Sequence, residues 1–293
     1  MIIPGILFLL GLLCLIKGGD WFVDGASALA RRFHLPELLI GATVVSVGTT
    51  LPEVMVSTIS AVSGHGEIAY GNAIGSVICN TALIAAITVA VRPGKVDPKP
   101  LRVPVAFFFA AAAIYCVAAY GMGRFTRPMG LLMLGMFVAY MAANVWQMKN
   151  APAEPEHEEE PMGIGKIVLL LVVGAALIAL TFVALGTSLP ELVTAITSLM
   201  KGHSDLSLGN VVGANVFNLV LVSGMSVTLA PFEIPQSATL FGINSSLVLE
   251  LPVMLLVMAL LTIPALVRGK LSRVQGVALL CIYAAFCAVQ FTM

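Results

Sequence analysis

The chain has 293 residues, of which 59% are hydrophobic and 10% are charged, and its mean hydropathy is +1.02. Soluble chains carry about 25% charged residues. The composition therefore excludes a soluble fold and predicts a protein embedded in a lipid bilayer. Fifteen basic residues balance fifteen acidic ones, so the chain has no net charge and no basic surface that would suit nucleic acid.

Apolar stretches long enough to cross a bilayer, which takes about 20 residues each, follow one another along the chain. The first half contains five, at 2–30, 35–63, 67–91, 103–122 and 127–148. A Glu- and Pro-rich stretch at 150–161 then predicts a solvated linker. The second half contains 163–202, 205–231, 238–264 and 272–293. Glu250 lies within the third of these, and a carboxylate inside an apolar run is a candidate functional group.

The two halves of the sequence repeat each other. Residues 48–53 (GTTLPE) return as 186–191 (GTSLPE), and 71–76 (GNAIGS) return as 209–214 (GNVVGA). The offset is 138 residues throughout, and a comparison of 40 positions at this offset finds 14 identities. Internal repeats of this kind are typical of secondary transporters, whose substrate site lies at the repeat interface near the middle of the membrane.

A cluster of oxygen-bearing side chains surrounds one glutamate in each repeat. Thr49 and Thr50 precede Glu53 by four and three residues, so the three side chains share one face of a helix. The second repeat carries Thr187, Ser188 and Glu191 in these places. The glycine before each motif and the proline within it weaken the helix, which frees backbone carbonyls that at membrane depth must line a cavity or bind an ion.

A polar stripe runs along the next span. Asn72, Ser76 and Asn80 recur every four residues, on one helix face. The second repeat carries Asn210, Ala214 and Asn218 in these places. Asn, Ser and Thr in membrane helices often bond only to a neighbouring helix or a carbonyl. The glutamates differ, because two carboxylates buried at equivalent places repel each other unless a cation or a proton lies between them.

The types of ligand narrow the choice of cation. Carboxylate, hydroxyl, amide and backbone oxygens are present, without Cys or His in either cluster, and such oxygens suit hard ions such as calcium and sodium. Two glutamates match the charge of one divalent ion. His65 and His203 lie in the short turns between spans, and we interpret them as loop residues.

These motifs resemble those of the calcium/cation antiporter superfamily, and specifically its prokaryotic sodium/calcium exchanger branch. Members carry a GTSLPE-type motif, then a GNxxGS-type motif and an Asn or Asp. The resemblance implies an all-α, polytopic membrane protein with two inverted-topology repeats of about five transmembrane helices. It divides the chain into a first repeat at 1–149 with the alpha-1 motif at 41–80, an acidic cytoplasmic linker at 150–162, and a second repeat at 163–293 with the alpha-2 motif at 179–218.

The resemblance also implies which residues hold the ions. Calcium would be bound by Glu53 and Glu191 together with the backbone oxygens of Thr49 and Thr187. Sodium would be bound by both glutamates together with Ser46, Thr50, Ser76, Asn80, Ala184, Ser188 and Asn218, where Ser46 and Ala184 mark backbone carbonyls. Because the ions share ligands, each must leave before the other binds, while the helix at 2–30 and its second-half counterpart slide past a fixed core. The implied partners are these ions and lipid, with no cofactor and no enzyme chemistry.

Two positions depart from the family pattern. Ala214 stands where the family commonly has Ser, which removes a hydroxyl from one sodium position. Asn218 stands where some members have Asp, and an uncharged amide argues against a potassium-coupled exchanger.

Ahead of its motif the second half is 18 residues short, because Gly18 would pair with Gly174 at an offset of 156 instead of 138. The stretch 163–202 shows no turn signal. If it crosses the membrane twice, twelve Lys and Arg residues fall on one side, and only Arg124 and Arg127 on the other. If it crosses once, eight Lys and Arg residues fall on one side and six on the other. The preference of basic residues for the cytoplasm favours a ten-span plan with both termini outside and the linker inside.

We predict a secondary antiporter of the cell inner membrane that exchanges sodium for calcium by alternating access. Two alternatives remain open. A proton/calcium exchanger would use Glu53 and Glu191 as proton carriers. A non-transporting, cation-binding membrane protein would account for the shortened second half. The oligomeric state is also open, and a monomer is compatible with the sequence.

Overall fold

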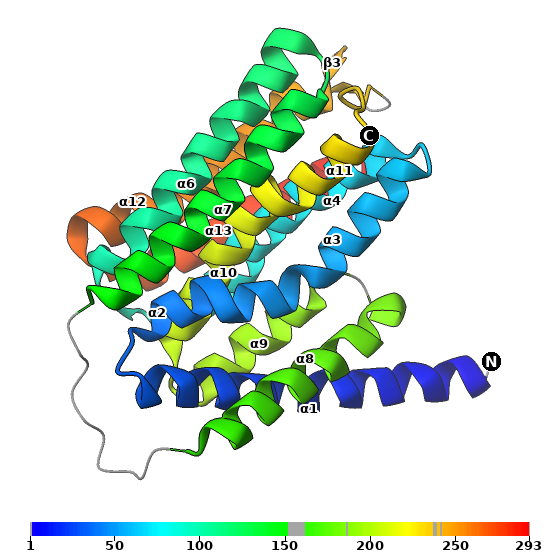
Figure 1. Ribbon diagram of the computed structural model, residues 1–293. Coiled ribbons are helices and arrows are strands. Elements are labelled where there is room, and N and C mark those ends of the chain that lie inside the picture. Colours follow the sequence, from blue (N-terminus) through cyan, green and yellow to red (C-terminus); the bar gives the residue numbers. More distant parts are fainter. Residues whose placement is uncertain (1, 152–161, 186, 237–238, 241, 293) are drawn as a thin grey trace.

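The computed structural model describes residues 2–151, 162–185, 187–236, 239–240 and 242–292, which are almost entirely helical (Figure 1). The expected all-α, polytopic fold is confirmed. The first half contains α1 (Ile2–Arg32), α2 (Glu37–Ile40), η1 (Gly41–Val45), α3 (Ser46–Val62), α4 (Gly66–Cys79), η2 (Asn80–Ala85), α5 (Ala86–Val91), β1 (Gly94–Lys95), α6 (Pro98–Cys116), η3 (Val117–Met122) and α7 (Arg127–Lys149), where η marks a π-helical turn.

The second half runs from α8 to α13. It contains α8 (Ile164–Leu185), α9 (Leu189–Met200), α10 (Ser204–Phe217), η4 (Asn218–Val222), α11 (Ser223–Leu229), β2 (Thr239–Leu240), β3 (Ile243–Asn244), η5 (Ser246–Glu250), α12 (Leu251–Arg268), β4 (Lys270–Leu271) and α13 (Arg273–Gln290). The strands form two short antiparallel pairs, β1 with β4 and β2 with β3.

Helices α1 and α8 form an antiparallel pair along one side of the molecule (Figure 1). Their backbones touch at glycines: a Cβ on Gly18 would lie 2.9 Å from the carbonyl oxygen of Gly174, and a Cβ on Gly174 would lie 2.8 Å from that of Gly18. Small residues allow such close approach in membranes. The pair packs on the other helices through its own small apolar cluster, which includes Phe22, Val45 and Leu206.

Helix α10 crosses the α2–η1–α3 segment at backbone contact. A Cβ on Gly209 would lie 2.1 Å from the carbonyl oxygen of Leu38, and a Cβ on Gly41 would lie 2.3 Å from that of Leu206. The larger apolar core packs around this crossing and includes the fully buried Phe108, Tyr140, Phe217 and Met254. The two motif-bearing segments are therefore held rigidly against each other at the centre of the molecule.

Seven helical runs in the described part of the chain are long and apolar enough to span a membrane. They are Glu37–Val62, Gly66–Val91, Pro98–Met122, Arg127–Lys149, Ser204–Leu229, Ser246–Arg268 and Arg273–Gln290. Ile164–Ala179 and Leu189–Met200 are shorter apolar helices. The count of ten spans stays a prediction.

The stretch 163–202 is one unbroken apolar run in the sequence, but it is not one continuous helix in the structure. It breaks into α8 and α9, with Thr187 and Ser188 in a turn between them. Helix α9 then runs back across α1, where Val193 lies against Gly19 and Lys201 reaches Asp24. The two crossings favoured by the distribution of basic residues agree with this reversal, and the packing of α9 against α1 holds it in place.

The basic residues expected on one side of the membrane gather at one end of the bundle. Four contacts tie this end together: Arg92 Nη1 to the Leu199 carbonyl (3.0 Å), Arg32 Nη1 to the Met162 carbonyl (3.1 Å), Arg273 Nε to the Ala90 carbonyl (3.0 Å), and β1 with β4. Helix α6 leads away from this end, so Arg124, whose backbone forms an antiparallel bridge with that of Glu233, lies at the opposite end. Because α8 and α9 run out and back, Lys166 and Lys201 belong to the basic end.

Gly209→Ala is expected to destabilise the fold, since the new Cβ would overlap the Leu38 carbonyl, a backbone group that cannot turn aside. Such overpacking costs about 1–3 kcal/mol, so Tm in detergent should fall by roughly 2–10 °C. Gly71→Ala is the repeat-related control, because its Cβ meets no described atom within 4 Å. Equal Tm values for the two variants would contradict the crossing described above.

Candidate cation site

Two carboxylates lie in the interior without a hydrogen-bond donor or a positive charge from the described residues to stabilise them. The Glu53 and Glu191 side chains are completely buried, and neither oxygen of either one has a hydrogen-bond partner. Among the described residues, the one charged group that acts on Glu53 is Glu191 itself. A buried carboxylate is stable only with a partner charge, a coordinated cation or a proton. The pair is therefore a candidate cation site built from one glutamate of each repeat.

The threonines of the two motifs bond across the repeat interface. Thr49 Oγ1 donates to Asn210 Oδ1 at 3.3 Å, and Thr187 Oγ1 donates to Asn72 Oδ1 at 2.9 Å. The two bonds are related by the repeat offset, so the site has approximate two-fold symmetry. Because each hydroxyl proton is taken by an amide, the lone pairs of each threonine oxygen remain free to face a cation.

Further polar contacts fix the two asparagines. Asn72 Nδ2 donates to Ser57 Oγ at 2.8 Å, and Asn210 Nδ2 donates to Thr194 Oγ1 at 3.1 Å. Because the amide nitrogen of each asparagine donates to a hydroxyl of its own repeat, Oδ1 points at the opposite repeat. Asn72 and Asn210 are thus positioning residues for the threonines. The sequence placed them on the polar stripe, but it gave no means of telling that they bond across the interface.

A pair of hydroxyls is present on one half of the site and incomplete on the other. Ser188 Oγ lies 3.2 Å from Ser76 Oγ. The repeat-related pair is Thr50 with Ala214, which has no hydroxyl, and the fully buried Thr50 Oγ1 has no partner. The structure therefore brings Ser76 and Ser188 together, and it shows the consequence of Ala214 at the equivalent place.

Asn80 and Asn218 each begin a π-helical turn, η2 and η4 respectively. Both side chains are completely buried, and neither the oxygen nor the nitrogen of either amide has a partner. π-helical turns recur at functional sites because they shift a helix out of its regular register. Two unpartnered amides at repeat-related turns are therefore available to an ion as neutral oxygen ligands.

The remaining predicted ligands are backbone groups. Ser46 is buried at the start of α3, and its single hydroxyl proton is shared between the carbonyls of Gly41 (2.9 Å) and Asn210 (3.0 Å). Ala184 lies in the last turn of α8, and its side chain falls outside the described residues. The ion-binding role of every predicted residue stays a prediction.

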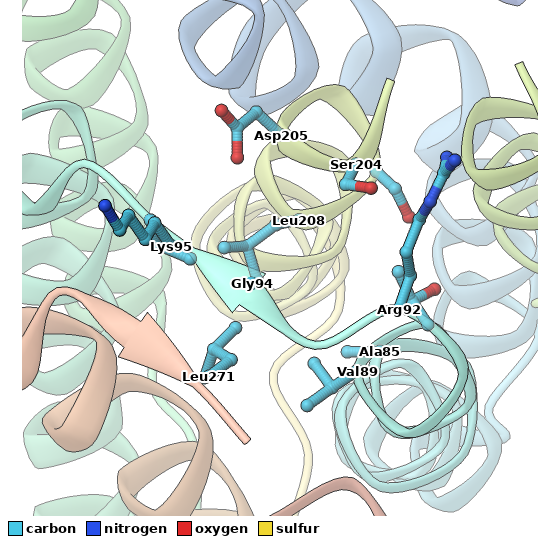
Figure 2. Close-up of a pocket in the computed structure, with 12 residues that line it drawn as sticks. Ala85, Val89, Arg92, Gly94, Lys95, Ser204, Asp205, Leu208 and Leu271 are labelled. Carbon is cyan, nitrogen blue, oxygen red and sulfur yellow. The ribbon is translucent and has the colours of Figure 1, made fainter. Parts of the chain in front are cut away.

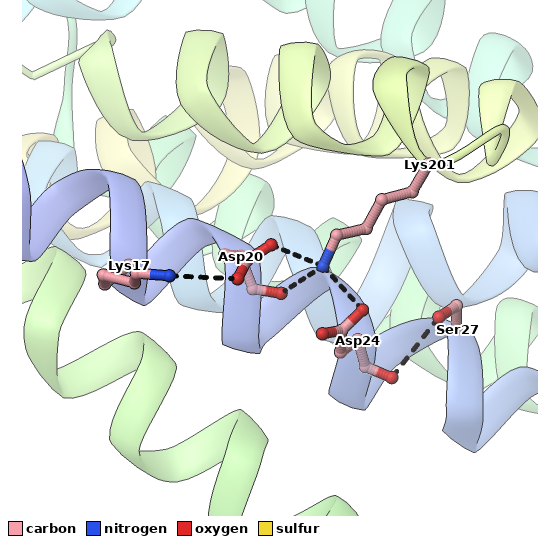
Figure 3. A network of polar contacts seen from close by, with 5 residues as sticks. All are labelled: Lys17, Asp20, Asp24, Ser27 and Lys201. Atoms are coloured by element: carbon pink, nitrogen blue, oxygen red, sulfur yellow. Dashed lines mark hydrogen bonds and ion pairs between the residues drawn. The ribbon is translucent and has the colours of Figure 1, made fainter.

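A polar network connects α1 with the end of α9 (Figure 3). Lys201 Nζ lies 2.5 Å from Asp20 and 2.6 Å from Asp24, and Lys17 lies 3.9 Å from Asp20. Partial burial works to lower the pKa of Lys201, but the hydrogen bonds to the two aspartates outweigh it, so the pKa is raised above its usual value. The lysine therefore stays charged and fixes α1 against α9.

Other candidate residues lie away from the glutamate pair. Ser246 Oγ and Gln290 Nε2 hold the Glu250 carboxylate at 3.0 and 3.4 Å. His203 pairs with Glu37 at 2.6 Å and His65 with Glu67 at 3.2 Å, in the turns where the sequence placed both histidines.

A pocket of about 40 Å³ opens at the basic end between β1 and α10 (Figure 2). Arg92, Lys95 and a single carboxylate, Asp205, line it together with apolar side chains. Two cations beside one carboxylate suit a calcium ion far less well than the glutamate pair does.

Comparison with known proteins shows what the chain is similar to. The sequence model of the family described as "Sodium/calcium exchanger protein" matches residues 3–146 and 163–292. The putative antiporter CaxA of Alkalimonas amylolytica is 32% identical over 327 aligned positions that cover 100% of this chain and 99% of the relative. The alignment is longer than this chain, so the relative carries residues that have no counterpart here.

Two further likenesses extend over nearly the whole chain. The sodium/calcium exchanger MaX1 of Methanosarcina acetivorans is 26% identical and covers 98% of each chain. The solved structure of the sodium-calcium exchanger NCX_Mj, soaked with 2.5 mM Na+ and 10 mM Sr2+, has a TM-score of 0.80 at 28% identity and covers 98% of each chain.

Asn210→Ala should weaken calcium binding, because Thr49 loses the acceptor that orients its hydroxyl. A lost buried hydrogen bond is worth roughly 1 kcal/mol, which corresponds to a rise in Kd of roughly fivefold to tenfold. Equilibrium binding of radioactive calcium in detergent measures it. Ser207→Ala, on the same helix, removes a buried hydroxyl that has no partner and serves as the control. Equal affinity in both variants would contradict the positioning role of Asn210.

Proposed function

Because this chain belongs to the sodium/calcium exchanger protein family, we propose that it is a secondary antiporter that exchanges sodium for calcium across the cell membrane by alternating access. The observation that carries the proposal is the pair of fully buried, unpartnered carboxylates, Glu53 and Glu191, at the interface of the two repeats. The exchangers to which the chain is similar are not enzymes, so we assign it no enzyme chemistry and no cofactor.

Calcium fits the pair on charge and on ligand type. One divalent ion neutralises two carboxylates, and calcium takes six to eight oxygen ligands. We propose that Glu53, Glu191, Thr49 and Thr187 hold it. Each threonine oxygen keeps its lone pairs because its proton goes to an asparagine of the other repeat. The asparagines thus favour ligation by the threonines without contacting the ion themselves.

Sodium is favoured over the proton by the neutral oxygens around the glutamates. A proton carrier needs only the carboxylates, whereas a sodium ion needs a shell of oxygens. We propose that sodium uses both glutamates and a set of neutral ligands, namely Thr50, Ser76, Ser188, Asn80, Asn218 and the carbonyls near Ser46 and Ala184. The unpartnered amides of Asn80 and Asn218 support this set. Exchange follows, because the glutamates serve either ion and cannot hold both.

The two halves of the site differ in exposure. Thr49 and Asn210 are buried, whereas Thr187 and Asn72 are half-buried. Asn72 lies two turns into α4, which starts beside Phe232 at the end opposite the basic residues. We infer that the site opens toward that end. With the basic end and the acidic linker in the cytoplasm and both termini outside, the structure corresponds to an outward-facing state.

The α1–α8 pair is the element we propose to move. It touches the rest of the molecule through a small apolar cluster and the Lys201 network, whereas α10 and the α2–η1–α3 segment meet at backbone contact. Movement of this pair past the rigid centre would expose the site to each side in turn. In this scheme 1–149 and 163–293 act as the two repeats, joined by the linker at 150–162.

The proposal is tested by radioactive calcium uptake into proteoliposomes that are loaded with sodium and diluted into sodium-free buffer. We expect uptake driven by the sodium gradient and none driven by a pH gradient alone. Uptake driven only by the pH gradient would favour a proton/calcium exchanger. Calcium binding without uptake under either gradient would identify a non-transporting protein.

Glu53→Gln and Glu191→Gln should each abolish the uptake, because a neutral amide cannot balance half the charge of a calcium ion. A decrease of at least about a hundredfold is expected, since several kcal/mol of electrostatic stabilisation are lost. Glu250→Gln is the matched control, because that carboxylate lies within a span but is held by Ser246 and Gln290. Uptake at the wild-type rate in either site variant would rule out the assigned site.

A further inference from the structure

The two π-helical turns that begin at Asn80 and Asn218 are anchored by different hydroxyl groups. In η4 the Ser223 hydroxyl donates to the backbone carbonyl of Asn218 at 3.0 Å, and the Ser223 backbone N–H donates to the same carbonyl. Because the one hydroxyl proton of Ser223 is used there, the Tyr115 hydroxyl donates to Ser223 Oγ and ties the turn to α6. The backbone of Asn218 is therefore fixed, whereas its buried amide has no partner among the described residues.

In η2 the anchor is the residue that directly follows Asn80. Thr81 Oγ1 accepts a hydrogen bond from Asn215 Nδ2 at 2.7 Å, and it donates to the Met258 sulfur at 3.9 Å. Thr81 and Asn215 are completely buried. Because Asn215 lies on α10, the bond ties the turn that carries Asn80 to the opposite repeat.

The fold itself does not require these polar anchors. The repeat-related positions of the three anchoring residues are apolar and buried: Leu219 for Thr81, Val77 for Asn215 and Ala85 for Ser223. Each π-helical turn therefore forms in one repeat without the hydroxyl that the other repeat uses. The polar version also has a cost, because Asn215 Oδ1 is buried without a partner among the described residues, and an unpaired buried acceptor is destabilising.

From these contacts we propose that Thr81 and Ser223 are positioning residues for sodium, each fixing the π-helical turn whose first residue is a neutral amide ligand. The inference rests on the proposed exchange and on the sodium role proposed for Asn80 and Asn218. Ordering a free side chain during binding costs affinity, so a ligand that is fixed beforehand binds its ion more tightly. The ligands proposed for calcium lie outside these turns, so the anchors act on sodium and much less on calcium.

The test compares the two ions in purified protein in detergent. Thr81→Val and Ser223→Ala each remove one anchoring hydroxyl, and Tyr115→Phe is a milder variant that removes the donor to Ser223. Two quantities are measured: the Kd for radioactive calcium, and the sodium concentration that displaces half of the bound calcium. We expect the sodium concentration to rise by a factor of roughly two to five, the effect of one lost buried hydrogen bond, while the calcium Kd stays within about twofold. Thr81→Ser keeps the hydroxyl and should restore the wild-type value.

Thr88→Val and Ser226→Ala are the matched controls. These two buried hydroxyls occupy repeat-related positions, and each donates to the carbonyl four residues earlier in its own helix, at 3.3 and 2.9 Å. Neither control should change either quantity. Wild-type sodium displacement in Thr81→Val and Ser223→Ala, or an equal loss of affinity for both ions, would overturn the inference. Failure of sodium to displace calcium from the wild-type protein would instead overturn the proposed exchange.

Discussion

The main physical constraint on this structure is the burial of two glutamates at one interface, with no basic side chain among the described residues to balance their charge. Neither carboxylate is bonded to a basic side chain or to a hydrogen-bond donor in the part of the chain that the structure describes. Removing such a pair from water costs several kcal/mol per charge unless a cation joins it. A cation between the carboxylates would account for three features of the site. The surrounding oxygens and the neutral amides would serve as its ligands, and the tight helix crossing would hold them in place. Without one, the same residues would be a large liability in a membrane interior.

The repeat explains the approximate symmetry of the site, and the differences between the two halves explain where that symmetry fails. Cross-repeat bonds from Thr49 to Asn210 and from Thr187 to Asn72 follow the same offset. The glycine surface of α10 packs against the α2–η1–α3 segment, but the matching glycines of α4, Gly71 and Gly75, meet no described atom within 4 Å. In the second half, α8 continues through the residues that repeat α2 and η1. The shortened half therefore supplies the ligands of its motif without a separate helix to cover α4.

Sequence and structure agree most closely where a single physical requirement determines a residue. The apolar lengths predicted the spans, and the offset of 138 residues predicted that Glu53 and Glu191 occupy equivalent places. Charge counting predicted that 163–202 runs out and back, and the turn falls at Thr187 and Ser188, within the motif whose glycine and proline weaken the helix. The contacts that the sequence could not predict are those between helices, because they depend on how the helices pack against one another. The partners of Asn72 and Asn210 and the link from Lys201 to Asp20 and Asp24 exist only after the helices pack. The π-helical turns at Asn80 and Asn218 likewise have no local sequence signal.

The most direct test of the account is to locate the ion. Crystals of the protein soaked in strontium, a heavier analogue of calcium, would be measured for anomalous scattering. The account predicts one strong peak between Glu53 and Glu191, at or slightly beyond the roughly 2.3–2.6 Å of calcium–oxygen bonds from their carboxylate oxygens and from the Thr49 and Thr187 oxygens. Well-ordered glutamates that share a proton through a direct hydrogen bond, with no peak between them, would contradict it.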